Sequence, residues 1–240
     1  MTQREPRATR ATHLLGQWLR YLRTNPPRGP ALADLRVWLA TTFLGRDLLT
    51  AGLPWITFPA TRWLGSYLRP SMSVFEWGSG GSTVFFARRV ARVVSIEYDP
   101  VWSEAVSARL RALGLANTEV RHIPPERGDD GALYRSSAAE FAGMSFRRYV
   151  DSVREHPDRG FDVILVDGRA RLGCVVTAMT RLRPGGVLLL DNSEREDAAE
   201  ACARLYGAGW PARHFEGPAP SSIWPAFWRT SAFSPPGPPR

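Results

Sequence analysis

The sequence of 240 residues contains no lysine, so all 31 of its basic side chains are arginines. This preference for arginine, together with frequent alanine, glycine and proline, is typical of GC-rich coding DNA. The formal net charge is +8, but the arginines are spread along the chain and form no basic block. That spread disfavours a dedicated nucleic-acid-binding surface, which needs clustered positive charge.

Cysteines and long apolar runs are also scarce. The only two cysteines, Cys174 and Cys202, lie in segments expected to be helical and have no partner at metal-ligand spacing, so reduced thiols are expected. The first ten residues are polar and unlike a signal peptide. The longest apolar runs are shorter than the roughly 18 residues that span a bilayer. We therefore expect a soluble, cytoplasmic protein with no membrane partner.

The first third of the chain has the pattern of a helical extension. Apolar residues recur at helical spacing over 13–23 and 31–49, and a third helix is expected over 60–68. Prolines and a glycine in 25–30 separate the first two helices. We expect residues 1–69 to form an extension that covers a site as a lid or pairs two subunits in a homodimer.

From residue 73 onward, short apolar runs alternate with amphipathic segments. This alternation predicts βαβ units and a mostly parallel sheet in one domain, residues 70–233. Strands are expected at 73–77, 92–97, 118–123, 161–166, 186–191, 213–216 and 228–233. Helices are expected near 82–90, 100–113, 145–155, 170–182 and 194–207. The proline-rich tail, 234–240, is expected to be disordered.

A glycine-rich loop follows the first of these strands, with the sequence Glu76-Trp77-Gly78-Ser79-Gly80-Gly81-Ser82-Thr83. Glycines permit sharp turns and the close approach of a ligand, and the helix that follows offers free N–H groups and a positive dipole end. The acid before the glycines, Glu76, would repel a pyrophosphate but suits an ammonium group. A second acid, Glu97, ends the next strand at about the 20-residue spacing from which a carboxylate reaches ribose hydroxyls. These features favour S-adenosylmethionine over a dinucleotide.

Three segments of the chain resemble motifs of the class I S-adenosylmethionine-dependent methyltransferases. Ser73–Pro100 is similar to their motif I and the acidic strand after it, Phe161–Gly168 to their fourth-strand motif, and Leu182–Asp191 to their LRPGG turn and fifth strand. The resemblance covers about residues 70–233. It implies an α/β, Rossmann-like fold with seven strands in the order 3-2-1-4-5-7-6, the seventh antiparallel. Ser82 stands at the family's third glycine position, where a small residue still allows close packing.

The same resemblance assigns cofactor-binding roles. It places the methionine part of S-adenosylmethionine on the glycine loop, the ribose on Glu97, and the adenine beside Tyr98 and Ile123. Asp167 either touches the cofactor's amino group or caps the next helix. The residues expected at the cofactor are Glu76, Gly78, Ser79, Gly80, Gly81, Ser82, Thr83, Glu97, Tyr98, Ile123 and Asp167.

Acidic and amide side chains also follow the fourth and fifth strands. Asp167 and the pair Asp191-Asn192 are expected to face one crevice, because parallel strands end at the same edge of a sheet. Three oxygen ligands of this kind can hold Mg²⁺ or Ca²⁺. The arrangement resembles the catechol, caffeoyl-CoA and macrolide sugar O-methyltransferases, in which a metal would bind the substrate hydroxyl and lower its pKa. Helix capping by these residues is the open alternative.

The match to the catechol enzymes departs at their basic residue, a lysine shortly after the strand-four acid. Here the segment is Gly168-Arg169-Ala170-Arg171, and arginine stays protonated and is a poor base. An arginine can instead bind a carboxylate or phosphate of a substrate. The residues expected at the substrate are Trp55, Tyr134, Arg169 and Arg171, with Tyr134 in an irregular lid-like segment, 131–144. The catalytic candidates are Asp167, Asp191 and His122, the last as a general base.

The sequence therefore predicts a methyltransferase acting on a hydroxyl of a small molecule, in a natural-product tailoring step, with the possible help of Mg²⁺ or Ca²⁺. One alternative is a methyltransferase of a nitrogen, an RNA or a protein. RNA enzymes of this fold usually add a recognition domain or an Asn-Pro-Pro-Tyr type motif, whereas strand four here ends in Val166-Asp167-Gly168-Arg169. The other alternative is a non-catalytic protein that binds S-adenosylmethionine.

Overall fold

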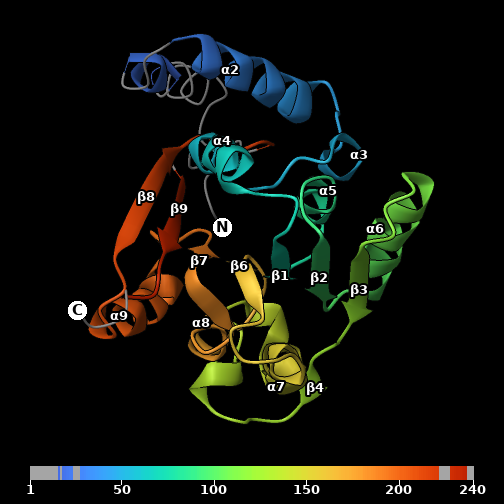
Figure 1. Cartoon of the computed structure of the whole chain (residues 1–240), viewed down its shortest axis with the longest axis vertical. Helices are drawn as coiled ribbons and strands as arrows, with labels where there is room; N and C mark the ends of the chain where they lie inside the picture. The colour runs from blue at the N-terminus through green and yellow to red at the C-terminus, as the bar shows by residue number, and fades with distance from the viewer. Residues whose placement is uncertain (1–15, 17, 24–27, 222–227, 237–240) are drawn as a thin grey trace, which may run out of the picture.

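The computed structural model describes residues 16, 18–23, 28–221 and 228–236. The expectations for residues 1–12 and for most of the proline-rich tail lie outside the described residues. Within them, a single seven-stranded sheet crosses the molecule between two layers of helices (Figure 1).

The strands run in the order β3-β2-β1-β6-β7-β9-β8, and β9 is antiparallel to both of its neighbours. This is the predicted order 3-2-1-4-5-7-6, with β6 and β7 as the fourth and fifth strands, so the predicted fold is confirmed. The strand bounds are β1 (Ser73–Trp77), β2 (Arg92–Glu97), β3 (Thr118–His122), β6 (Phe161–Val166), β7 (Leu182–Leu190), β8 (Ala212–Gly217) and β9 (Trp228–Phe233).

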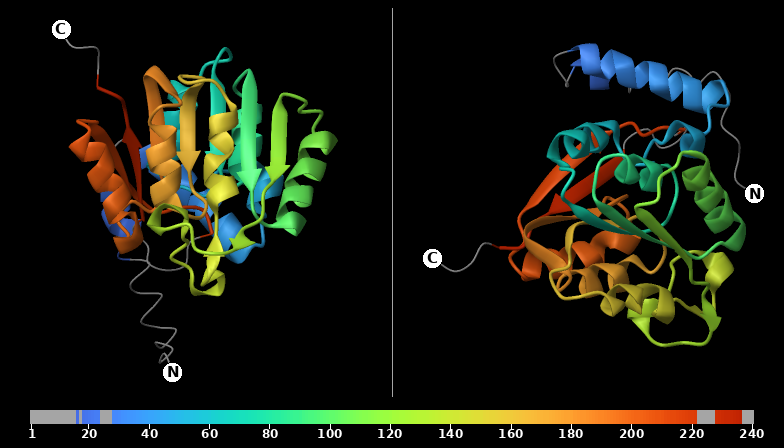
Figure 2. Two further views of the ribbon diagram at one scale, coloured as in Figure 1. Left: turned by 90° about the horizontal axis from the view of Figure 1, so that it is seen from below. Right: turned by 45° about the vertical axis from the view of Figure 1, so that its right-hand side comes forward.

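Helices cover both faces of the sheet, which explains why the central strands are apolar on both sides. On one face lie α4 (Phe58–Tyr67), α5 (Gly81–Ala87) and α6 (Pro100–Ala112) (Figure 1). On the other lie α7 (Arg147–Asp151), α8 (Arg171–Ala178) and α9 (Ala199–Gly207), as Figure 2 also shows. Along β1 the side chains alternate between these faces, so that Val74 packs toward α5 and Phe75 toward α7 and α8.

The N-terminal extension differs from its prediction in one respect. The single helix expected over 31–49 is two helices, α2 (Arg28–Phe43) and α3 (Leu48–Ala51). Gly45, with φ of 67°, takes the chain out of α2, and the Asp47 carboxylate caps α3 by accepting a 2.6 Å bond from Thr50 N–H. In Figure 1, α2 lies outside α4, and the ring of Trp18 packs against Trp38 and Phe58 between them.

The segment between β3 and β6 was the least well predicted. It holds a short antiparallel pair, β4 (Glu126–Arg127) and β5 (Met144–Ser145), and two 3₁₀ turns, Ala132–Tyr134 and Ala139–Phe141. The helix expected over 145–155 is α7 followed by a 3₁₀ turn, Ser152–Glu155, and the start of the helix expected over 194–207 is a 3₁₀ turn, Glu196–Ala198. Elements of two to four residues are too short to carry a detectable period.

No helix within the described residues combines the length and the apolar character required to cross a bilayer.

Candidate functional site

The candidate site lies where β1, β2, β6 and β7 end at one edge of the sheet. Gly78 begins the turn after β1 with φ of 98°, a left-handed conformation that favours glycine. A Cβ there would lie 3.1 Å from the Asp167 carbonyl and 3.2 Å from the Gly168 amide nitrogen. The glycine loop is therefore pressed against the end of β6, and a larger residue at position 78 would separate the two.

Glu76 lies beneath this loop and is fully buried. Its Oε1 accepts a 2.5 Å hydrogen bond from the Thr83 hydroxyl, whose oxygen in turn accepts a 2.9 Å bond from Gly80 N–H. Its Oε2 has no hydrogen-bond partner among the described residues. A buried carboxylate oxygen without a partner is unfavourable, so this atom marks a place for a donor that the described residues do not supply.

Burial raises the pKa of Glu76 to about 7, although the Thr83, Ser82 and Ser95 hydroxyl groups around it act in the opposite direction. The negative charge of Glu97 raises this pKa further. Near neutral pH the carboxyl group is thus divided between its two protonation states. A cation bound near Oε2 would stabilise the ionised form.

Glu97, at the end of β2 and expected to bind ribose, already accepts hydrogen bonds from the protein on both carboxylate oxygens. Its Oε1 accepts bonds from Tyr98 N–H (2.9 Å) and Asp99 N–H (3.0 Å). Its Oε2 accepts bonds from the amide (2.9 Å) and the hydroxyl (3.1 Å) of Ser79. Because a carboxylate offers about four acceptor positions, a ribose hydroxyl would have to replace the Ser79 hydroxyl. In this arrangement Glu97 holds the glycine loop to β2.

The residues expected beside the adenine gather at the same end of the sheet. The Tyr98 ring packs edge-on against Phe141, and the Arg169 guanidinium lies 5.4 Å over the Tyr98 ring. Ile123 is buried and donates its N–H to the Glu97 carbonyl (2.7 Å). The His122 ring nitrogen Nε2 lies 3.1 Å from the Tyr98 carbonyl, so it must carry a proton to bond there. His122 is therefore placed to fix Tyr98, which leaves only its Nδ1 for the expected role as a base.

The N-terminal extension reaches the glycine loop directly, a contact that no pattern in the sequence indicated. A Cβ on Gly81 would lie 2.1 Å from the Leu53 carbonyl oxygen and 2.7 Å from that of Leu48. Glycine at position 81 is thus required for contact with this segment. Further along, Phe58 N–H bonds to the Pro218 carbonyl just beyond β8 (2.9 Å). The exposed Trp55 lies between these two anchor points along the chain.

Three further residues shape the site without having been predicted. Trp102 of α6 donates its indole N–H to the Ser79 carbonyl (2.7 Å). The buried Tyr149 hydroxyl occupies the space that a Cβ on Gly168 would need, at 2.0 Å. Thr230 of β9 accepts a 3.2 Å bond from Thr57 N–H. Each contact joins residues that are distant in the sequence, so no local sequence pattern predicts it.

Asp167, Asp191 and Asn192 do come together at the ends of β6 and β7, but around an arginine. One Arg171 guanidinium nitrogen lies 3.4 Å from Asp167 Oδ1 and 3.1 Å from Asn192 Oδ1, and the other bonds to the Asp191 carbonyl (2.7 Å). The carboxylate of Asp191 turns away and accepts a 2.6 Å bond from the Thr230 hydroxyl. Asn192 adopts a left-handed conformation, with φ of 48°.

This arrangement does not fit a divalent cation. The Arg171 guanidinium already supplies the positive charge between the strand ends, and Asp191 directs its carboxylate to Thr230. Among the described residues, no group of three or more His, Cys, Asp or Glu side chains is placed to hold a metal ion. Burial raises the pKa of Asp167 well above its usual value, and the nearby Asp191 charge adds to the effect while Arg171 opposes it. Burial likewise raises the pKa of Asp191 to about 6.

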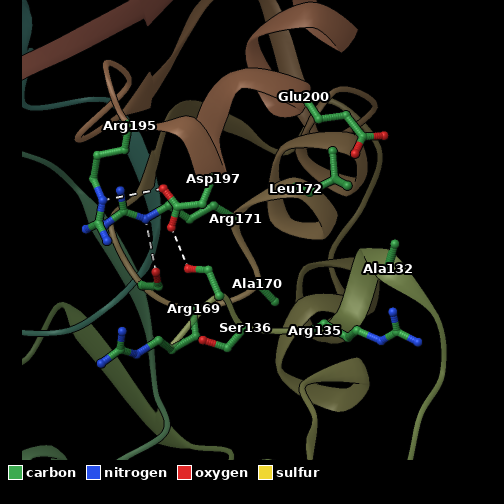
Figure 3. Close-up of a pocket in the computed structure, with 12 residues that line it drawn as sticks. Ala132, Arg135, Ser136, Arg169, Ala170, Arg171, Leu172, Arg195, Asp197 and Glu200 are labelled. Atoms are coloured by element: carbon green, nitrogen blue, oxygen red, sulfur yellow. Dashed lines mark hydrogen bonds and ion pairs between the residues drawn. The ribbon is translucent and has the colours of Figure 1, made fainter. Parts of the chain in front are cut away.

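A cavity of about 160 Å³ opens beside this cluster. Figure 3 shows three segments around it: the turn around Arg169, the segment around Ser136, and the 3₁₀ turn with Asp197 that leads into α9 with Glu200. Of the residues expected at the substrate, Arg169 and Arg171 line it. Tyr134 packs instead beneath the Arg147 guanidinium (5.7 Å), and Trp55 belongs to the segment over the opposite face of the sheet.

Neither a protein-family model nor a curated protein sequence matches the chain. Among solved structures, an O-methyltransferase from Bacillus cereus in complex with SAH is similar over 84% of this chain and 97% of its own, with a TM-score of 0.56 and 16% identity. A precorrin-6y C5,15-methyltransferase from Geobacter metallireducens is similar over 75% and 88%, with a TM-score of 0.52 and 13% identity. An rRNA methylase from Streptococcus thermophilus is similar over 74% and 97%, with a TM-score of 0.50 and 16% identity. At these identities the similarity establishes a shared fold.

Proposed function

We propose that this chain, which has the class I methyltransferase fold, transfers a methyl group from S-adenosylmethionine to a hydroxyl group of a small molecule. The unpartnered Oε2 of Glu76 beneath the glycine loop is the observation that supports this most directly. A buried carboxylate suits the ammonium of the cofactor's methionine part and disfavours a pyrophosphate. The loop around Glu76 has small side chains and leads into the N-terminus of a helix. Both features allow a ligand to approach the backbone closely.

The cofactor would supply an activated methyl group on its sulfonium. The chain's own residues would hold and orient the acceptor, which can supply much of the rate enhancement for an in-line displacement. Asp167 is the carboxylate best placed to accept the hydroxyl proton, because 22% of its side chain is exposed at the strand ends. Asp191 is 2% exposed and bonded to Thr230, so it is better suited to holding β7 and β9 together.

Two other functions remain candidates. The rRNA methylase among the similar structures and the net charge of +8 favour an RNA methyltransferase, for which a nitrogen is also a possible target. The second candidate is a non-catalytic protein that binds S-adenosylmethionine but does not transfer its methyl group. The O-methyltransferase from Bacillus cereus has the higher TM-score, and the cavity of about 160 Å³ suits a small acceptor. From the sequence alone we further propose a cytoplasmic natural-product tailoring step and a homodimer.

The test is calorimetric titration of the full chain with S-adenosylhomocysteine, followed by turnover with labelled S-adenosylmethionine and a panel of hydroxylated metabolites. We expect micromolar binding and a labelled, methylated product identified by mass spectrometry. Absence of binding would contradict the proposal. Binding without any S-adenosylhomocysteine production across the panel would favour the non-catalytic alternative.

A further inference from the structure

The start of α8 lacks the side-chain cap that a helix N-terminus usually has. Ala170 stands at the N-cap position in a left-handed conformation, with φ of 48°, and offers no side-chain acceptor to the first turn. The first turn also contains no acidic residue. Residues 168–172 line the cavity, so this positive end of the helix faces it.

Arg169 and Arg195 line the same cavity and are only loosely paired. An Arg169 guanidinium nitrogen donates a 3.2 Å bond to the Tyr98 hydroxyl and lies 3.5 Å from the carboxylate of Glu140, which is 60% exposed. Arg195 is 52% exposed and lies 3.4 Å from Asp197. Exposed ion pairs of this length contribute little, so either arginine can exchange its partner for a ligand. Arg169 is also held against the rings of Tyr98 and Phe141, which limits the conformations it would lose on binding.

Arg171 has a different part in this cavity. It is 12% exposed, and its three nitrogens bond to oxygens of Gly168, Asp167, Asp191 and Asn192. Because its nitrogens already donate to these oxygens, the Arg171 guanidinium holds the strand ends together. It contributes positive charge to the cavity but has no free donor for a ligand among its present contacts. Arg135, which is paired with Asp129, and Glu200, which is paired with Arg204, also line the cavity. Two hydroxyl groups lie beside them. The Ser136 oxygen accepts a 3.2 Å bond from Ala138 N–H, and the Ser137 hydroxyl donates to Asp197 Oδ2 (2.5 Å).

Asp197 thus lies between a hydroxyl donor and an arginine at the rim of the cavity, where an external oxyanion would find the same partners. We propose that this cavity binds an anionic oxygen group of the methyl acceptor, a phosphate or a carboxylate, between Arg169, Arg195 and the start of α8. The acceptor role rests on the proposed methyl transfer, whereas the anion site does not. The cavity of about 160 Å³ exceeds the roughly 10–15 Å³ that one water molecule needs by enough to accommodate such a group.

The proposal is tested by calorimetric titration of the full chain with inorganic phosphate and, separately, with acetate, each with and without saturating S-adenosylhomocysteine. We expect Arg169→Gln and Arg195→Gln each to weaken binding about tenfold, because each removes a charge-assisted contact. Asp197→Asn should strengthen it by removing the competing carboxylate. Arg111→Gln is the matched control, since it breaks an exposed ion pair with Glu104 on α6 and should leave binding unchanged.

Thermal melting with S-adenosylhomocysteine verifies that each variant folds and binds cofactor. Tighter binding of phosphate than of acetate supports the site and assigns a phosphate-bearing acceptor, and the reverse order supports it with a carboxylate. The proposal is overturned if neither anion binds the wild-type chain, or if Arg111→Gln weakens binding as much as Arg169→Gln. Because both anions are also titrated without cofactor, failure of S-adenosylhomocysteine to bind would count against the proposed function alone.

Discussion

At the scale of the residue, Glu76 couples the candidate site to pH. Its pKa of about 7 lies above the ordinary glutamate value, so the folded chain retains a proton that the unfolded chain has already lost. Titration of Glu76 alone should therefore lower the free energy of unfolding by about 3 kcal/mol as pH rises from about 4.5 to 7. A bound ammonium favours the ionised form, so ligand affinity should change in the opposite direction.

The corresponding prediction concerns S-adenosylhomocysteine, which carries the same ammonium group. Its affinity should rise about tenfold between pH 6 and pH 8, as the ionised fraction of Glu76 grows. In Glu76→Gln this rise should be lost, whereas Glu104→Gln, a change at a 70% exposed side chain on α6, should retain it. Calorimetry across this pH range measures both. An affinity independent of pH in the wild-type chain would show that Glu76 does not meet the ammonium.

At the scale of the element, the segment around α3 and the start of α5 form one unit. The carbonyls of Leu48 and Leu53 lie where a Cβ on Gly81 would be, and both are backbone atoms that cannot rotate away. Gly81→Ala should therefore lower the free energy of unfolding by about 2 kcal/mol and weaken S-adenosylhomocysteine binding, because the glycine loop must shift. Denaturant unfolding and calorimetry measure the two effects.

Gly65 is the matched control for this substitution. It lies within α4, and a Cβ there would have open space around it. Gly65→Ala should raise the free energy of unfolding by up to about 1 kcal/mol, because alanine has the higher helix propensity, and should leave ligand binding unchanged. Equal effects of the two substitutions would mean that the extension does not pack on the loop as described.

The same scale explains what the sequence could predict. The order of the seven strands was predictable because the glycine loop, the strand-four motif and the LRPGG segment resemble motifs of a family in which that order is implied. The contact of Leu53 with Gly81 and the bond from Thr230 to Asp191 were not, because they join segments that only the folded sheet brings together. Asp167 and Asn192 were correctly placed at one edge, but their spacing in the sequence could not reveal that Arg171 lies between them.

At the scale of the whole molecule, the net charge of +8 could reflect either a nucleic-acid-binding surface or dispersed charge, and the ion pairs favour dispersed charge. Many arginines are paired with carboxylates on several different elements, among them Arg121 with Glu155, Arg148 with Glu126 and Arg183 with Asp162. Charge that is dispersed and paired in this way neutralises few nucleic-acid phosphates at once. Filter binding of a single-stranded RNA should therefore weaken only slightly with salt, with a log–log slope no steeper than about −2 between 50 and 200 mM. A much steeper slope, with tight binding at the lower salt concentration, would require a continuous basic surface and would favour an RNA acceptor over a small molecule.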